Sequence, residues 1–219
     1  MNYPSLVSLR EVAPRDGWQK FKTVLPTEVK RELICSMIDY GARELEIGVF
    51  SSDPVRGRQY QDLDSLCQMV LPYAAEKGVR VTALVESVEA ARRASTLGIR
   101  HVDFFLSVSD TFGRGFGSTP VEAFATLEAI ASLPDLQVQA ALGAVFGCPF
   151  GDATPLEKTL AYARRAMELG PPPWAWETPP EWPTPSIPSA SCGGFWSASG
   201  QSRSHCTSTT LRDLVLPTA

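Results

Sequence analysis

The sequence predicts an α/β protein built around a parallel β-sheet, and three observations support this. Over the first 170 residues, short apolar runs rich in β-branched residues alternate with amphipathic stretches of helical period. The alternation occurs five times, at intervals of about 30 residues. Several helical stretches end at a glycine, the residue most often found just after a helix. Five strand–helix units imply either a doubly wound sheet or part of a closed barrel.

The first two units have simple boundaries. The run LVSLREV (6–12) predicts a strand and is followed by a Pro-Arg-Asp-Gly turn. The stretch TEVKRELICSMIDYGA predicts a helix that stops at Gly41. RELEIGVF predicts the second strand, and DLDSLCQMVLPYAAEKG predicts a helix that stops at Gly78. In the first helix, the residues expected to face the core are Val29, Leu33, Ile34, Met37 and Ile38.

The last three units follow the same pattern. RVTALVE precedes SVEAARRASTLG, where Ser87 is the expected N-cap, and HVDFFLSVS precedes TPVEAFATLEAIASL, with Thr119 as N-cap and Pro120 in the first turn. LQVQAALGAVFG precedes TPLEKTLAYARRAMELG, which repeats the Thr-Pro start. No GxGxxG follows the first strand, which disfavours a dinucleotide-binding sheet. A (β/α)8 barrel needs eight units and about 250 residues. We therefore expect residues 1–170 to form an incomplete (β/α)8 barrel of about five units, followed by an irregular C-terminal tail.

Composition excludes several classes of function. Hydrophobic residues make up 44% of the chain and charged residues 20%, which is ordinary for a globular protein. The net charge of −4 argues against a nucleic-acid or polybasic membrane partner. No apolar run approaches the ~20 residues that span a bilayer, and the N-terminus lacks a signal-peptide pattern. The five cysteines form no CxxC pair, so we expect reduced thiols and a cytoplasmic protein.

The candidate site residues lie where strands end, since this edge carries the active site in barrels. Arg15 and Asp16 follow the first strand, with Gln19 one turn later. An aspartate can bind a hard divalent cation, and an arginine can stabilise a carboxylate or a developing oxyanion. Taken alone, the same turn favours a plain Asp-Gly turn with an arginine salt bridge over a functional site. Glu46, within the second strand, either points into the barrel and needs a partner or faces solvent.

Other polar residues carry weaker signals. Cys148, in FGCPFG, is interpreted as a small buried side chain in preference to a nucleophile. Ser107, Ser109 and Asp110 could line a site by position only. His101 begins a strand, at the edge opposite the expected site, and is interpreted as structural.

These motifs resemble hydroxymethylglutaryl-CoA lyase, a member of the metal-dependent lyase and Claisen-condensing barrel superfamily. The resemblance rests on EVAPRDGWQ, PTEVKRELI, LEIGVFSS, LSVSDTF with VEAFATLEAI, and VFGCPFGD, and covers about residues 8–170. Isopropylmalate and homocitrate synthases share a variant of the PRDG-x-Q turn, whereas VFGCPF is the sharper lyase marker. The chain departs from the family at Trp18, Lys20 and Gly117, which leaves the exact acyl-CoA open.

The resemblance implies a retro-Claisen cleavage of hydroxymethylglutaryl-CoA to acetyl-CoA and acetoacetate. By the same resemblance, Asp16 matches a ligand of Mg²⁺ or Mn²⁺, Arg15 the enolate-stabilising arginine, Glu46 a supporting carboxylate and Gln19 a substrate-positioning residue. The family also uses a His-x-His metal pair, a later asparagine ligand and a mobile cysteine loop, which this sequence does not contain. We therefore expect weak or no metal binding and doubtful activity in this chain. A family-like homo-oligomer is correspondingly less expected.

The segment 171–219 breaks the pattern. It holds half of the eighteen prolines, four of the five tryptophans and no lysine. Tryptophan has a single codon, so the segment can be partly back-translated. Reading WAWETPPEWPTP one base earlier permits Val-Gly-Leu-Gly-Asp-Thr-Ala-Gly-Met-Ala-Asn-Pro, and the same shift over 204–218 permits a His-Phe-His sequence. Two family motifs in one frame predict that this Pro/Ser/Trp-rich tail is a frameshift product. The alternative is a genuine low-complexity tail.

The sequence leaves two other functions open. One is a related acyl-CoA Claisen-condensing synthase or aldolase on the same barrel, and the other is a non-catalytic remnant. An open set of five units would expose sheet edges on the first and fifth strands, so the chain is expected to aggregate readily. The tail is expected to be coil, with at most a short helix near 209–214.

Overall fold

The computed structural model describes residues 9–169 and 209–210. The described strands form one sheet in the order β1-β2-β3-β4-β5-β6, in which the first five run parallel and β6 is antiparallel to β5. Neighbours in the sheet are thus also neighbours in the sequence, as in a barrel opened along one seam. The strands are β1 (Arg10–Glu11), β2 (Glu44–Phe50), β3 (Arg80–Val85), β4 (His101–Ser107), β5 (Gln137–Gly143) and β6 (Thr209–Thr210).

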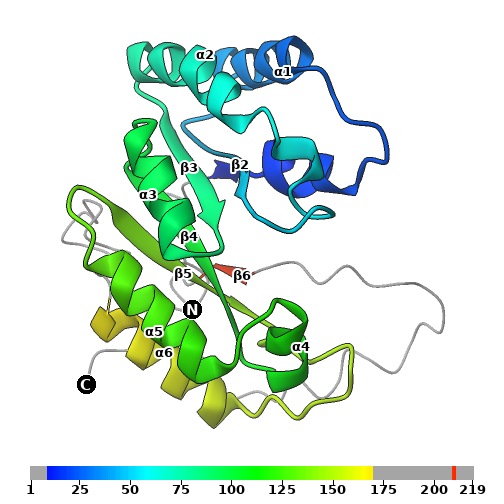
Figure 1. Ribbon diagram of the computed structural model, residues 1–219, viewed down its shortest axis with the longest axis vertical. Helices are drawn as coiled ribbons and strands as arrows, with labels where there is room; N and C mark the ends of the chain where they lie inside the picture. Colours follow the sequence, from blue (N-terminus) through cyan, green and yellow to red (C-terminus); the bar gives the residue numbers. More distant parts are fainter. Residues whose placement is uncertain (1–8, 170–208, 211–219) are drawn as a thin grey trace, which may run out of the picture.

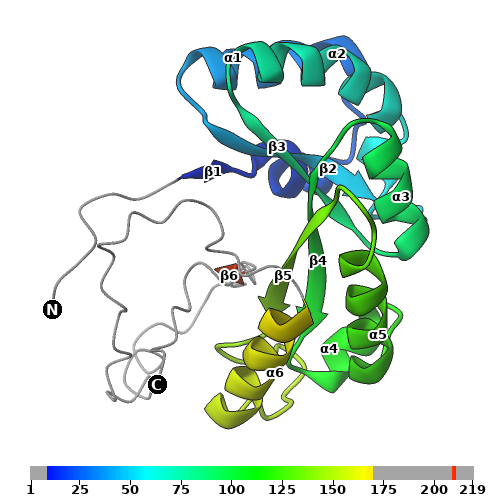
Figure 2. The same cartoon turned by 90° about the vertical axis from the view of Figure 1, so that its left-hand side faces the viewer.

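Helices connect the parallel strands and lie on the outer side of the curled sheet (Figures 1 and 2). The arrangement is five successive βα units of an incomplete (β/α)8 barrel, which confirms the fold expected from the sequence. The helices are α1 (Thr27–Asp39), α2 (Leu63–Glu76), α3 (Val88–Thr96), α4 (Asp110–Gly115), α5 (Pro120–Ala131) and α6 (Leu156–Leu169), with short turns η1 (Ala13–Gly17), η2 (Trp18–Lys20) and η3 (Arg58–Tyr60).

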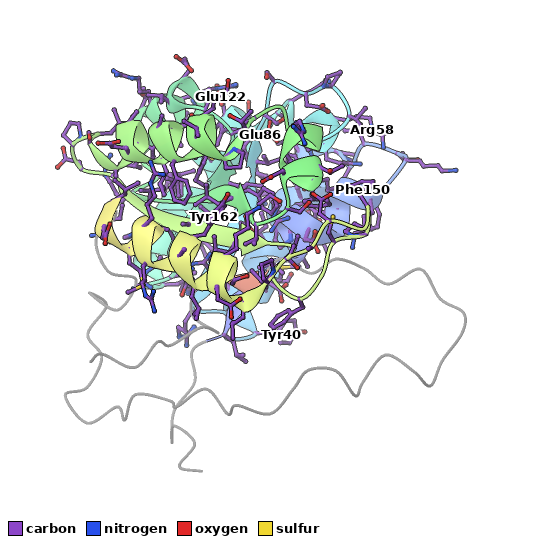
Figure 3. All side chains as sticks on the ribbon, turned by 90° about the horizontal axis from the view of Figure 1, so that it is seen from below. Tyr40, Arg58, Glu86, Glu122, Phe150 and Tyr162 are labelled. Atoms are coloured by element: carbon purple, nitrogen blue, oxygen red, sulfur yellow. The ribbon has the colours of Figure 1, made fainter. Side chains whose placement is uncertain are left out.

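The two faces of the sheet differ in chemistry because side chains alternate along a strand. The outward residues of β2 to β5 are apolar and pack against the helices in one hydrophobic core. The inward residues include Glu46, Thr82 and Asp103, which are buried but polar. The helices α5 and α6 also lie side by side, with Tyr162 between them (Figure 3). The ring centroids of Tyr162 and Phe124 of α5 are 5.2 Å apart in an edge-to-face contact. The core therefore lies outside the sheet, and the inner face is free to carry polar groups.

Most helix ends form as the sequence predicts. Ser87 accepts a hydrogen bond from the Ala90 N–H, and Thr119 forms a capping box with Glu122, with Pro120 in the first turn. Gly41 and Gly78 have φ of +106° and +66°, a left-handed conformation that favours glycine after a helix.

The core-facing side of α1 differs from the expectation. Val29 and Leu33 are 38% and 41% exposed, whereas Lys30 is fully buried together with Ile34 and Ile38. The helix has turned by about one residue, because burying Lys30 gives its ammonium two partners. Lys30 Nζ lies 2.6 Å from Asp62 Oδ1 and also donates to the Gln59 carbonyl.

Asp62→Ala is expected to lower the free energy of unfolding by about 3 kcal/mol, because it leaves the Lys30 ammonium buried without a counter-charge. Lys30→Met should cost less, since Asp62 is partly exposed and keeps its hydrogen bond from Thr27 Oγ1 at 2.6 Å. Urea unfolding of both variants measures the difference. Equal losses in the two variants would contradict this account of the pair.

Four segments differ from the sequence-based expectation. β1 is Arg10–Glu11, so Leu9 and Val12 of the expected strand 6–12 lie outside it, while 6–8 fall outside the described ranges. The Pro-Arg-Asp-Gly turn is a π-helical turn, and the short helix α4 was not foreseen. Thr209–Thr210 pair as a strand with Ala141 and Leu142, so the expectation of coil, with at most a short helix, is wrong at these two residues. The other expectations for the tail fall on residues outside the described ranges. No helix in the described part of the chain is both long and apolar enough to cross a bilayer.

Candidate active site

The turn that carries Arg15 and Asp16 is held from two sides. Within η1, the Val12 carbonyl accepts hydrogen bonds from the N–H groups of both Arg15 (3.0 Å) and Asp16 (2.7 Å). From η3, the Tyr60 hydroxyl donates to the carbonyls of Pro14 (3.1 Å) and Arg15. The Tyr60 ring can lie this close to β2 because Gly48 has no side chain. A Cβ at this position would stand only 2.8 Å from the ring. The turn at the carboxyl end of β1 is therefore fixed in position by β2 and the segment after it.

Arg15 brings two predicted site carboxylates together. Its Nε lies 2.9 Å from Glu46 Oε2, and its Nη1 donates to Asp16 Oδ1 at 3.3 Å. The side chains of Arg15 and Glu46 are 14% and 3% exposed, whereas that of Asp16 is 42% exposed. Of the two interpretations of Glu46, the structure supports the inward one: it is buried and paired. One guanidinium thus joins a buried carboxylate to an accessible one.

Burial makes Glu46 easy to protonate. Loss of hydration raises the pKa of Glu46 most, Arg15 lowers it and the Asp103 carboxylate raises it, and the net result is a pKa of about 7. Near neutral pH, Glu46 can therefore either accept or hold a proton. Such a group suits positioning or proton transfer beside a cation, although structural ion pairs also shift pKa values.

Gln19 is less closely tied to this cluster. It lies in η2 with a half-buried side chain, and in the described part of the chain no hydrogen bond links its amide to Arg15, Asp16 or Glu46. Trp18, beside it, is buried in the core. Lys20 Nζ stands 3.7 Å from Asp16 Oδ2. The turn therefore packs through Trp18 and leaves the Asp16 carboxylate toward solvent.

The donor set around Asp16 does not by itself make a metal site. Within residues 9–169 and 209–210, no group of three or more His, Cys, Asp or Glu side chains is placed to hold a metal ion. Asp16 offers one or two oxygens, whereas Mg²⁺ takes about six ligands. Both carboxylate oxygens already face cations, Arg15 and Lys20. The described residues could supply one ligand to a shared site but do not fit a resident ion alone.

Cys148 departs from the expectation of a buried apolar side chain. It is only partly buried, and its Sγ lies 3.0 Å from Ser109 Oγ and accepts from the Phe150 N–H at 3.3 Å. Partial burial opposes ionisation, but these hydrogen bonds outweigh it and lower the pKa of the Cys148 thiol. Ser109 also donates to Asp152 Oδ2 at 2.7 Å. The thiol therefore belongs to a polar cluster that joins the loops after β4 and β5.

Ser107, Ser109 and Asp110 do not share one role. The hydroxyl of Ser107 donates to the Ser109 carbonyl at 2.7 Å, and both serines are buried. Asp110 is exposed and pairs with Lys158 Nζ at 2.9 Å. The serines stabilise the loop after β4, and Asp110 ties α4 to α6.

His101 lies at the amino end of β4, as the sequence predicts, and burial followed by the charge of Arg80 lowers its pKa to about 4. A folded-state pKa below the unfolded value of about 6.5 gives stability that is present above pH 6.5 and lost as pH falls toward 4. As pH falls from 6.5 to 4, the free energy of unfolding of the native chain should therefore decrease more than that of His101→Gln. Urea unfolding at pH 7 and 4.5 measures this, and a constant difference would contradict the assignment.

Sequence reasoning missed a second buried charge cluster on the inner face. Arg10 of β1 bonds Glu44 of β2 and Asp103 of β4, each at 2.8 Å, and Gln139 of β5 at 3.1 Å. The available signal was a charged or amide residue at alternate positions inside apolar strands. Such residues need partners when buried, which points to an inward polar row.

Comparison with known proteins agrees with this geometry. No family model matches the chain. The chain is 31% identical over 175 residues to (R)-citramalyl-CoA lyase of Chloroflexus aurantiacus. The aligned region covers 75% of this chain and 55% of that protein. The chain is 29% identical over 174 residues to a hydroxymethylglutaryl-CoA lyase of Bacillus subtilis, with coverage of 78% and 57%. The N-terminal part of the chain is similar to hydroxymethylglutaryl-CoA lyases. The chain spans just over half the length of these relatives.

Solved structures of hydroxymethylglutaryl-CoA lyases share the fold. The Bacillus subtilis enzyme superposes with a TM-score of 0.71 at 29% identity, covering 78% of this chain and 57% of that one. A lyase from Acinetobacter baumannii, solved in complex with coenzyme A and 3-methylmalate, superposes with a TM-score of 0.69 at 24% identity and covers 75% and 53%. Both comparisons place this half-barrel within the lyase barrel.

Proposed function

We propose that this chain carries the N-terminal half of the active site of a carbon–carbon lyase acting on an acyl-CoA of the hydroxymethylglutaryl-CoA type. The observation that supports this most is the cluster of Arg15, Asp16 and Glu46 at the carboxyl end of β1 and β2. The similarity to a hydroxymethylglutaryl-CoA lyase and to a citramalyl-CoA lyase supports an acyl-CoA as the class of substrate. No membrane or nucleic-acid partner enters this proposal, and the protein would act in the cytoplasm.

The residues of this chain would take distinct roles in a retro-Claisen cleavage. The 3-hydroxyl of the substrate would give its proton to a base, the bond between C2 and C3 would break, and C3 would become the ketone carbon of acetoacetate. The electron pair would pass to the acetyl-CoA enolate, which would take up a proton at C2. Arg15 would stabilise the negative charge on the enolate oxygen, since a fixed guanidinium in a poorly hydrated site acts strongly on developing charge. Glu46 would hold Arg15 in place, and Gln19 would orient the acyl group. A divalent cation, with Asp16 as one ligand, would polarise the substrate oxygens.

We also propose that the reading frame changes near Gly170. The shifted reading of 171–219 supplies a Gly-x-Gly-Asp-Thr motif and a His-x-His pair, which the lyase resemblance calls for in its second half. A single lost base suffices. Sequencing the DNA around the Gly170 codon tests this: one additional base there supports the proposal, and an unchanged reading contradicts it.

The reaction class is tested by expressing the gene with the base restored and read to its own stop codon. That protein should release acetyl-CoA from hydroxymethylglutaryl-CoA or citramalyl-CoA in the presence of Mg²⁺. A Claisen-condensing synthase, the alternative reaction on this barrel, would instead release free CoA from acetyl-CoA and a 2-oxo acid. Acetyl-CoA and free CoA are separated by chromatography. Free CoA as the sole product would replace the lyase with the synthase, and no turnover at all would favour a non-catalytic remnant.

A further inference from the structure

The inner face of the half-barrel holds a buried row of charges that the proposed chemistry does not use. Arg10 reaches from β1 across the face to Glu44, Asp103 and Gln139, which belong to three other strands. Glu44 and Asp103 are 2% and 3% exposed. Removing these charges from water costs free energy that only close pairing offsets, and Arg10 supplies that pairing.

This row borders Glu46. Glu44 and Glu46 lie two residues apart on the same face of β2, a separation of ~7 Å along a strand. Arg10 holds Glu44 and Asp103 at the same time, so the two carboxylates and Glu46 share one poorly hydrated region. Asp103 Oδ2 accepts a hydrogen bond from Arg10 Nη1, but Asp103 Oδ1 has no hydrogen-bond partner among the described residues. One buried oxygen of Asp103 thus lacks a hydrogen bond on the inner face that also carries Glu46.

We propose that Asp103 and Arg10 are positioning residues that set the protonation of Glu46 and, through it, the strength of the Arg15–Glu46 pair. Asp103 favours protonated Glu46, because like charges in one low-dielectric region disfavour ionisation. Arg10 favours ionised Glu46 and limits the effect of Asp103. The other groups that face Glu46 are Arg15 from η1 and Tyr60 from η3. The charge effect rests on the burial of these groups together on the inner face and on the pairing of Arg10 with Glu44 and Asp103, and its use in turnover rests on the proposed function.

The test follows the Glu46 carboxyl in the full 219-residue chain by ¹³C NMR between pH 4 and 9. Glu46→Gln assigns the signal. Asp103→Asn should lower the titration midpoint of Glu46 by about one pH unit, because it removes a like charge. Arg10→Met should raise the midpoint, because it removes an opposite charge. A residue with only a structural role would not move the midpoint in opposite directions in the two variants.

Two further variants keep the test decisive. Asp62→Asn removes a carboxylate paired with buried Lys30, outside the inner row, and should leave the Glu46 midpoint unchanged. Glu44→Gln serves as the test if Asp103→Asn does not fold. It frees part of the Arg10 charge and should lower the titration midpoint of Glu46. Amide spectra establish folding for each variant. A Glu46 midpoint that stays within ~0.2 pH unit in both Asp103→Asn and Glu44→Gln overturns the proposal. Because no turnover is measured, failure of the lyase function would leave this outcome unaffected.

Discussion

Arg15→Met, placed in the frame-restored protein, is expected to lower kcat by about 10²–10³-fold while leaving the affinity for Mg²⁺ unchanged. The guanidinium is 14% exposed and held by Glu46 on one side and Asp16 on the other, so its charge acts in a poorly hydrated region. If Arg15 acts on the enolate, its loss weakens binding of the transition state more than binding of substrate or metal. Acetyl-CoA release measures kcat, and calorimetry measures Mg²⁺ binding.

This variant should still fold, because Glu46 can take up a proton when Arg15 is removed. Burial already raises the pKa of Glu46 to about 7, and loss of the guanidinium raises it further. Arg58→Met is the matched control: Arg58 lies nearby in η3, is bonded to the Phe21 carbonyl at 2.8 Å, and should leave kcat unchanged. A fall in kcat of similar size in both variants, or in neither, would remove Arg15 from the proposed role.

Asp16→Ala in the same protein is expected to weaken Mg²⁺ binding by at least about 100-fold, since loss of even a supporting residue outside the ligand shell costs 10–100-fold. Of the two carboxylates paired with Arg15, Asp16 has the more exposed side chain, 42% against 3% for Glu46. Asp110→Ala, which removes an exposed carboxylate paired with Lys158, is the control and should bind normally. Mn²⁺ titration followed by electron paramagnetic resonance measures both. Unchanged Mn²⁺ affinity in Asp16→Ala would exclude it as a ligand.

The alternation of strands and helices predicts the half-barrel well, because apolar periodicity and glycine or Thr-Pro boundaries are local signals. The signals fail where a long-range partner decides. Lys30 looks like a solvent-facing residue of α1, and only its contact with Asp62, from the next unit, explains its burial. The short helix α4 depends on Ser109 accepting from the Phe112 N–H, while Ser109 itself is held by Asp152 far along the chain.

The candidate site was predictable in part. The PRDG turn and Glu46 stand out because a carboxylate inside an apolar strand needs a partner, and Arg15 provides it. The same argument applies to Asp103, but its partner Arg10 lies 93 positions away and gives no local signal. Cys148 was misjudged because its environment is set by Ser109, across two loops. The pattern thus locates polar residues on the inner face but does not pair them.

The most direct measurement compares acetyl-CoA release from hydroxymethylglutaryl-CoA by this 219-residue chain and by the frame-restored protein, each with and without Mg²⁺. The account predicts no release by the 219-residue chain, since Asp16 alone supplies one or two of the about six ligands the cation takes. It predicts Mg²⁺-dependent release by the restored protein. Release by the 219-residue chain itself, or none by a folded restored protein that binds Mg²⁺, would contradict it.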